Sequence, residues 1–184
     1  MVEKENNPPI PPLQKGGKGG FKKRGKGRSP PPKVLILGVG NLLLRDEGFG
    51  VHLIKSLEGI SFPENVQLLE AGTVSHQLIP LFHSIDYLIV IDVIEAGDGP
   101  GSIFKFSPDD VKFRSERMLS LHQMGIIDIL QMAELTGAKP KTIIIGIQPK
   151  DISSWSLELS DELKAVIPRV KDLIFEELRK IKAI

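Results

Sequence analysis

Short apolar runs alternate with longer amphipathic segments along the chain from Val34 onward. A run that is apolar throughout is typical of a strand covered on both faces, and apolar spacing of three or four residues is typical of a helix. The predicted strands cover residues 34–39, 66–70, 86–94, 102–106 and 141–149, and the predicted helices cover residues 47–58, 77–83, 121–137 and 161–181. The run at 102–106 alternates in polarity, which predicts an edge strand, and Pro168 is expected to interrupt the last helix early.

This alternation of strands and helices predicts an α/β fold in which helices cover both faces of a mainly parallel, twisted sheet. A three-layer α/β/α arrangement follows from that pattern. The 184 residues are enough for a single domain with a sizeable core but too few for two such domains. We therefore expect one folded domain.

The first 33 residues have a different composition from the rest. They contain seven of the 14 prolines and six of the 18 glycines, and they carry a net charge of +7, whereas residues 34–184 carry −6. With little apolar surface to bury, residues 1–33 are predicted to form a disordered basic tail, and residues 34–184 the folded domain. Only Phe21 could stack on a base, so we expect no nucleic acid partner.

Composition also excludes several kinds of site. The chain has no cysteine, which excludes a thiol nucleophile, a disulfide framework, an iron-sulfur cluster and a thiolate zinc site. No stretch approaches the roughly 20 apolar residues that span a bilayer, so we expect no membrane partner. The basic N-terminus lacks the apolar core of a secretory signal, and a cytoplasmic protein is the default expectation.

Acidic residues follow two of the predicted strands. In a sheet with the common 2-1-3 strand order, a crevice opens between the carboxyl ends of the first and third strands. Glu47, with its neighbour Asp46, lies just beyond the first strand, and Asp92 lies at the end of the third. The two strands therefore bring Glu47 and Asp92 to one crevice.

His122, at the start of the helix predicted over 121–137, is placed to join these acids. One imidazole and two carboxylates form a mixed ligand set for a divalent ion such as zinc or nickel, with positions left for water or substrate. Each residue also has a structural explanation. Asp46 and Glu47 suit the first turn of a helix, Asp92 can bond to backbone, and a single histidine is often a surface residue at a helix end.

Other sites fit the sequence poorly. The turn GVGNLL has Leu43 where a dinucleotide-binding fingerprint has its third glycine. Neither GxSxG nor HExxH occurs, which removes the hydrolase elbow and the common zinc-protease helix. The acidic segment LLLRDE would repel the phosphate of a flavin, and the same argument disfavours a small-molecule phosphorylase or hydrolase.

Four segments together resemble the endopeptidases that mature nickel-iron hydrogenase large subunits. They are GVGNLLLRDEGFGVHLIKSLE, IDVIEAGDGPGSIFKF, SLHQMGIIDILQMAELTG and IIIGIQP, and they occur in the family's order and at similar spacing. The resemblance covers roughly residues 34–180. It implies a phosphorylase/hydrolase-like sheet between helices, and an enzyme that removes the C-terminal extension of the large-subunit precursor after nickel insertion.

The resemblance also implies which residues bind metal. The family's glutamate, aspartate and histidine positions fall on Glu47, Asp92 and His122. Family members are thought to use them to recognise nickel that the substrate already holds, so we expect no tightly held cofactor. The partner is then the hydrogenase large-subunit precursor, and the protease is expected to be a monomer. The catalytic residues are not identified, although Asp46 and Glu70 are candidates to orient a ligand or water.

One departure from the family pattern concerns the second strand. Many members have D-G-G-T there, whereas this chain has EAGT at residues 70–73. The carboxylate is kept but is one methylene longer, which leaves substrate identity open. The alternative function is a noncatalytic assembly factor that binds the nickel-loaded precursor without cutting it.

Overall fold

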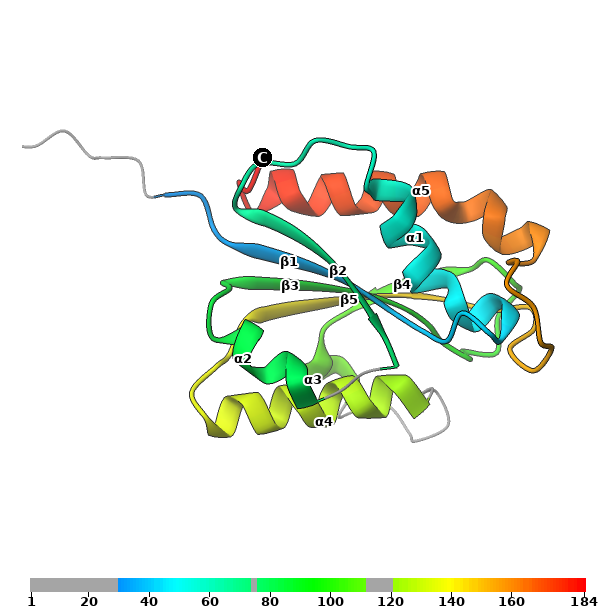
Figure 1. Ribbon diagram of the computed structural model, residues 1–184, viewed down its shortest axis with the longest axis horizontal. Coiled ribbons are helices and arrows are strands. Elements are labelled where there is room, and N and C mark those ends of the chain that lie inside the picture. Colours follow the sequence, from blue (N-terminus) through cyan, green and yellow to red (C-terminus); the bar gives the residue numbers. More distant parts are fainter. Residues whose placement is uncertain (1–29, 74–75, 112–120) are drawn as a thin grey trace, which may run out of the picture. The chain divides into compact units, whose positions relative to one another are not determined.

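The computed structural model describes residues 30–73, 76–111 and 121–184 (Figure 1). Five strands form one sheet with the order β2-β1-β3-β5-β4. They are β1 (Val34–Val39), β2 (Val66–Gly72), β3 (Tyr87–Val93), β4 (Ile103–Phe106) and β5 (Lys141–Ile147). The helices are α1 (Phe49–Leu57), α2 (Ile79–Phe82), α3 (Pro108–Val111), α4 (Leu121–Leu135) and α5 (Asp161–Lys180), with short 3-10 helices η1 (Arg45–Gly48) and η2 (His76–Leu78).

Apolar side chains on both faces of the sheet explain its three layers. Every residue of β1 is buried, as expected of a central strand that helices cover on both sides. One core cluster joins the sheet to α1 and α5, and a second cluster joins the opposite face to α2 and α4. Figure 1 shows the two helix layers on either side of the strands. The predicted α/β fold with a mainly parallel sheet is confirmed.

The strand pairing confirms the predicted neighbours. β1 pairs in parallel with both β2 and β3, and β3 pairs in parallel with β5. β4 pairs antiparallel with β5. It lies at the edge of the sheet, which is the position that its alternating pattern predicts. The carboxyl ends of β1 and β3 therefore lie side by side. The boundary between tail and domain at residue 33 stays a prediction, because residues 1–29 lie outside the described residues.

The prediction that Pro168 interrupts the last helix is wrong. α5 runs without a break from Asp161 to Lys180 with Pro168 inside it. Proline removes one backbone donor, which leaves the carbonyl of Lys164 without its helical partner. Both Pro168 and Lys164 are exposed, so water can satisfy that carbonyl. In the described part of the chain, no helix combines the length and apolar character needed to cross a membrane.

Candidate functional site

Two glycines let α1 pack directly on the backbone of the central strands. A Cβ on Gly38 of β1 would overlap the carbonyl oxygen of Gly50 in α1. A Cβ on Gly50 would overlap the carbonyl oxygens of Val39 and Ile91, which belong to β1 and β3. The first turn of α1 therefore rests on the carboxyl ends of both strands. This close approach fixes where the preceding loop lies.

Glu47 lies in η1, the 3-10 helix that leads into α1. Gly40, just after β1, has a φ of +141°, and a Cβ there would overlap the carbonyl oxygen of Glu47. Glycine is suited to both this backbone angle and the close approach. Residues of η1 also contact β3. Glu47, which is partly buried, therefore lies at the edge where β1 and β3 end together.

Asp92 is the next-to-last residue of β3, and its side chain is fully buried. One carboxylate oxygen, Oδ1, accepts a hydrogen bond of 2.8 Å from the backbone N–H of Val93. Side chains alternate along a strand, and Leu88 and Val90 pack with α2 and α4. Asp92 thus lies on the face of the sheet that α4 covers, at the same edge as Glu47. The structure brings the two predicted acids to neighbouring strand ends.

The backbone of His122 lies in the first turn of α4. α4 leads into the amino end of β5 and runs opposite to the parallel strands, so its first turn lies toward their carboxyl ends (Figure 1). The side chain of His122 lies outside the described residues. Among the side chains that are described, no three His, Cys, Asp or Glu gather as metal ligands would. The set of Glu47, Asp92 and His122 stays a prediction.

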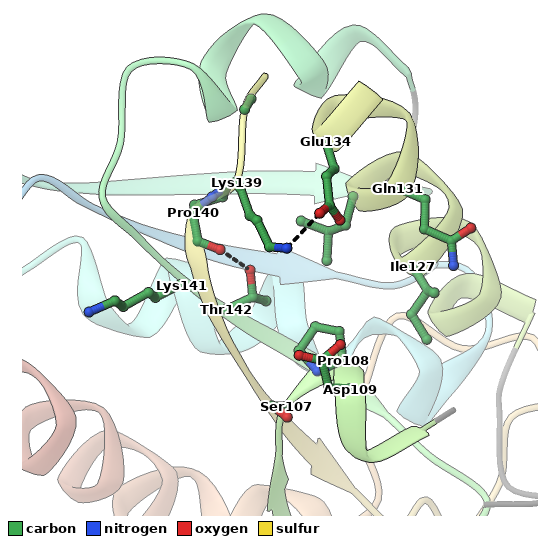
Figure 2. Close-up of a pocket in the computed structure, with 12 residues that line it drawn as sticks. Ser107, Pro108, Asp109, Ile127, Gln131, Glu134, Lys139, Pro140, Lys141 and Thr142 are labelled. Carbon is green, nitrogen blue, oxygen red and sulfur yellow. Dashed lines mark hydrogen bonds and ion pairs between the residues drawn. The ribbon is translucent and has the colours of Figure 1, made fainter. Parts of the chain in front are cut away.

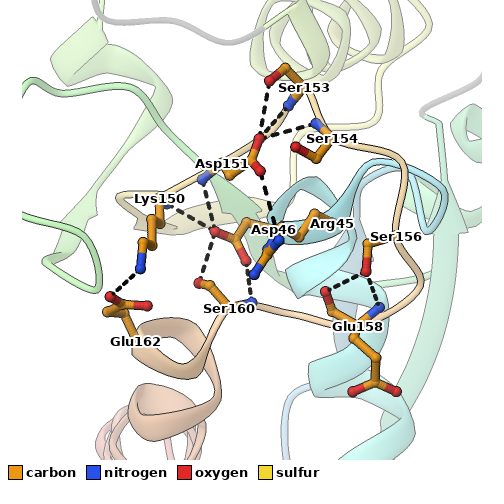
Figure 3. Close-up of polar contacts among 10 residues, drawn as sticks. All are labelled: Arg45, Asp46, Lys150, Asp151, Ser153, Ser154, Ser156, Glu158, Ser160 and Glu162. Atoms are coloured by element: carbon orange, nitrogen blue, oxygen red, sulfur yellow. Dashed lines mark hydrogen bonds and ion pairs between the residues drawn. The ribbon is translucent and has the colours of Figure 1, made fainter.

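Asp46 has a role that its sequence position does not indicate. Its carboxylate is fully buried and accepts hydrogen bonds from the backbone N–H groups of Lys150 (2.9 Å), Asp151 (3.0 Å) and Ser160 (2.7 Å). It also accepts one from the hydroxyl of Ser160 at 2.9 Å (Figure 3). Ser160 is the N-cap residue of α5. Asp46 therefore joins the β1–α1 loop to the loop before α5.

Backbone contacts join the same two loops. Leu44 and Ser156 form an isolated parallel bridge, with the N–H of Ser156 donating to Leu43 and the N–H of Arg45 donating to Ser156. Arg45 has a φ of 44°, in the left-handed region that few side chains adopt. The N–H of Asp46 also donates to the carbonyl of Asp151 at 3.1 Å. The loop that carries Glu47 is thus held along its length.

Asp151 stabilises the turn of its own loop. Its Oδ1 accepts hydrogen bonds from the backbone N–H groups of Ser153 and Ser154, each at 3.0 Å (Figure 3). The Ser154 side chain and these two N–H groups hold the pKa of Asp151 well below its usual range. The carboxylate of Asp151 is therefore charged wherever the protein is folded near neutral pH.

Glu70 lies on the other face of the sheet from Asp92. Its carboxylate is 3.9 Å from the ammonium nitrogen of Lys55 in α1. Leu69, the residue before it, packs with the cluster of α2 and α4, so alternation places Glu70 on the α1 face. Its proposed role in orienting a ligand or water stays a prediction.

A pocket of about 490 Å³ lies elsewhere in the domain. It is lined by residues of α4, of the segment that enters β5 and of the start of α3, including Ile127, Leu130 and Asp109 (Figure 2). Within it the Lys139 ammonium donates to the Glu134 carboxylate at 2.5 Å. None of the predicted site residues lines this pocket.

Comparison with known proteins points to one family. A family model described as hydrogenase maturation protease matches residues 51–177. The hydrogenase expression/formation protein HupD of Rhizobium leguminosarum bv. viciae is 35% identical over 156 residues, which are 83% of this chain and 77% of that protein. HupM of Azotobacter chroococcum is 38% identical over 137 residues, 73% of this chain and 66% of that protein. The solved structure of the hydrogenase maturating endopeptidase HybD from Escherichia coli superimposes with a TM-score of 0.72 at 29% identity, over 80% of this chain and 93% of HybD.

Proposed function

This chain belongs to the hydrogenase maturation protease family, and from that premise we propose that it is an endopeptidase that acts on a nickel-iron hydrogenase large-subunit precursor. It removes the C-terminal extension after nickel has been inserted. The nickel belongs to the substrate, and this chain recognises it through Glu47, Asp92 and His122. The reaction is hydrolysis of one peptide bond.

The position of Glu47 and Asp92 carries this proposal. Glu47 follows β1 and Asp92 is the next-to-last residue of β3. These two strands pair in parallel, and η1 contacts β3. In open α/β sheets, ligands bind at the carboxyl ends of the strands. Two carboxylates at one such edge favour a cation over an anion, and Asp92 in particular is buried, where a cation lowers the cost of its charge.

The chemistry of the set suits a metal that arrives with the substrate. Two carboxylates and one imidazole, without a thiolate, are expected to bind a free nickel ion only moderately, and they leave coordination positions open. Nickel held between the precursor and this chain would polarise the scissile carbonyl. Water then attacks the carbonyl carbon, the C–N bond breaks, and the new amine takes a proton. The contacts of Asp46 support a positioning role, because they hold the loop that carries Glu47.

Incubation of the purified chain with nickel-loaded precursor separates this function from the alternative. The proposed protease converts the precursor to a shorter large subunit, which intact-mass measurement detects together with the released peptide. Glu47→Gln is the matched control, since it keeps the side-chain size and loses the charge. Stable binding without a change of mass would instead favour a noncatalytic assembly factor.

A further inference from the structure

Three large apolar side chains are exposed on the two loops that Asp46 joins. Trp155 is 80% exposed, Leu157 62% and Leu43 50%. We call these three residues the apolar loop patch. The N–H of Ser156, which lies between Trp155 and Leu157, donates to the carbonyl of Leu43 at 3.1 Å. The patch therefore gathers residues more than 100 positions apart in the sequence at one place.

The backbone beneath the patch is firmly held. The Leu44–Ser156 bridge and the hydrogen bonds to Asp46 fix both loops. Asp151 adds bonds to the turn that precedes Trp155. Side chains presented on a fixed backbone lose less conformational entropy on binding than side chains on a slack loop. Exposed apolar groups on a rigid support are typical of a protein interface.

We propose that the apolar loop patch binds the large-subunit precursor beside the segment that is cut, an inference that rests on the proposed function. Leu43 is four residues before Glu47 on the same hydrogen-bonded loop. A protein that brings its nickel to Glu47 covers this loop as it binds. Through Leu43 the patch shares the loop that carries Glu47, and it contacts the part of the precursor that surrounds the nickel.

The composition of the surroundings fits a protein partner. Trp is enriched among the residues that contribute most to protein interfaces, where an apolar centre is surrounded by polar groups. Charged side chains of both signs border the patch, among them Arg45 and the ion pair of Glu158 with Lys164, whose atoms are 2.8 Å apart. Three large side chains expose on the order of a few hundred Å², enough for one anchoring part of a larger interface.

The test compares the processing kinetics of the wild type and two variants. Trp155→Ser and Leu157→Ser, made together, are expected to raise the KM for nickel-loaded precursor at least about tenfold with little change in kcat. Leu135→Ser is the matched control, since Leu135 is 88% exposed at the end of α4, and its KM is expected to equal that of the wild type. Equal KM values for wild type and the double variant would overturn the proposal.

A second readout does not depend on cleavage. Trp155 is the only tryptophan, so 5-fluorotryptophan labelling gives one ¹⁹F resonance. We expect that resonance to shift or broaden when precursor is added. A changed resonance without cleavage would support binding through the patch and contradict the protease function. Cleavage with an unchanged resonance would support the protease function and overturn the proposal for the patch. A resonance that changes with the concentration of this chain alone would assign the patch to a second copy and overturn the proposal.

Discussion

Asp46 and Glu47 are adjacent in the sequence but have different surroundings. The carboxylate of Asp46 is fully buried and accepts four hydrogen bonds from residues 150–160. Glu47 is partly buried at the edge shared by β1 and β3. At the scale of single residues, Asp46 stabilises the loops, and Glu47 is the residue that we propose binds the nickel of the substrate. Sequence reasoning could find both acids, but not the donors of Asp46, which lie more than 100 residues away.

Asp46→Ala is expected to lower the free energy of unfolding by about 3 kcal/mol, because it leaves buried N–H groups without their charged acceptor. Ser160→Ala removes only the hydroxyl donor and is expected to cost about 1 kcal/mol. Glu47→Gln serves as the control, with a change of less than about 1 kcal/mol expected at a partly buried position. Urea denaturation followed by circular dichroism measures all three. Equal midpoints for Asp46→Ala and Glu47→Gln would contradict the role of Asp46.

The lowered pKa of Asp151 predicts a pH dependence. Hydrogen bonds from the Ser154 side chain and from the N–H groups of Ser153 and Ser154 favour the charged form in the folded state. The stabilisation is therefore complete above the unfolded pKa, near 4, and is lost as pH falls through the lower folded pKa. The stability difference between wild type and Asp151→Asn should be constant above about pH 5 and shrink below about pH 4. A stability difference that grows on acidification would contradict a lowered pKa of Asp151 in the folded state.

At the scale of elements, periodicity predicts where strands and helices lie better than where they begin. All five strands form where the sequence predicts them, with β4 predicted from its alternating pattern, and Ile126 and Ala133 of α4 are buried, as expected for a helix with apolar spacing. The helix predicted from Glu47 begins at Phe49 because η1 precedes it. α5 continues through Pro168 because the affected backbone faces solvent. These differences depend on tertiary surroundings, which local patterns do not contain.

The packing of α1 gives a prediction at this scale. Gly50→Ala places a methyl group against the carbonyl oxygens of Val39 and Ile91, and the shift needed is expected to cost about 2–3 kcal/mol of stability and to displace Glu47. Gly59→Ala is the matched control, since a Cβ there has no atom within 4 Å. Thermal unfolding and processing rate measure the two effects. An unchanged melting temperature for Gly50→Ala would contradict the close packing.

At the scale of the whole molecule, sheet topology joins the parts of the site. Alternating strands and helices predict the 2-1-3 order, and with it the meeting of Glu47 and Asp92 at one edge. Sequence alone could not predict that residues 43–46 pair with residues 151–156. Such contacts between distant loops leave no periodic pattern in the sequence. They fix the loop that carries Glu47 and the position of Trp155.

The most direct test of the central claim is intact-mass measurement of matched precursors, one loaded with nickel and one without. We expect the wild-type chain to shorten only the nickel-loaded precursor. Glu47→Gln, Asp92→Asn and His122→Ala are each expected to lower the rate at least about 100-fold while the circular dichroism spectrum is unchanged. Equal cleavage of the nickel-free precursor, or normal cleavage by the three variants, would contradict nickel recognition by these residues.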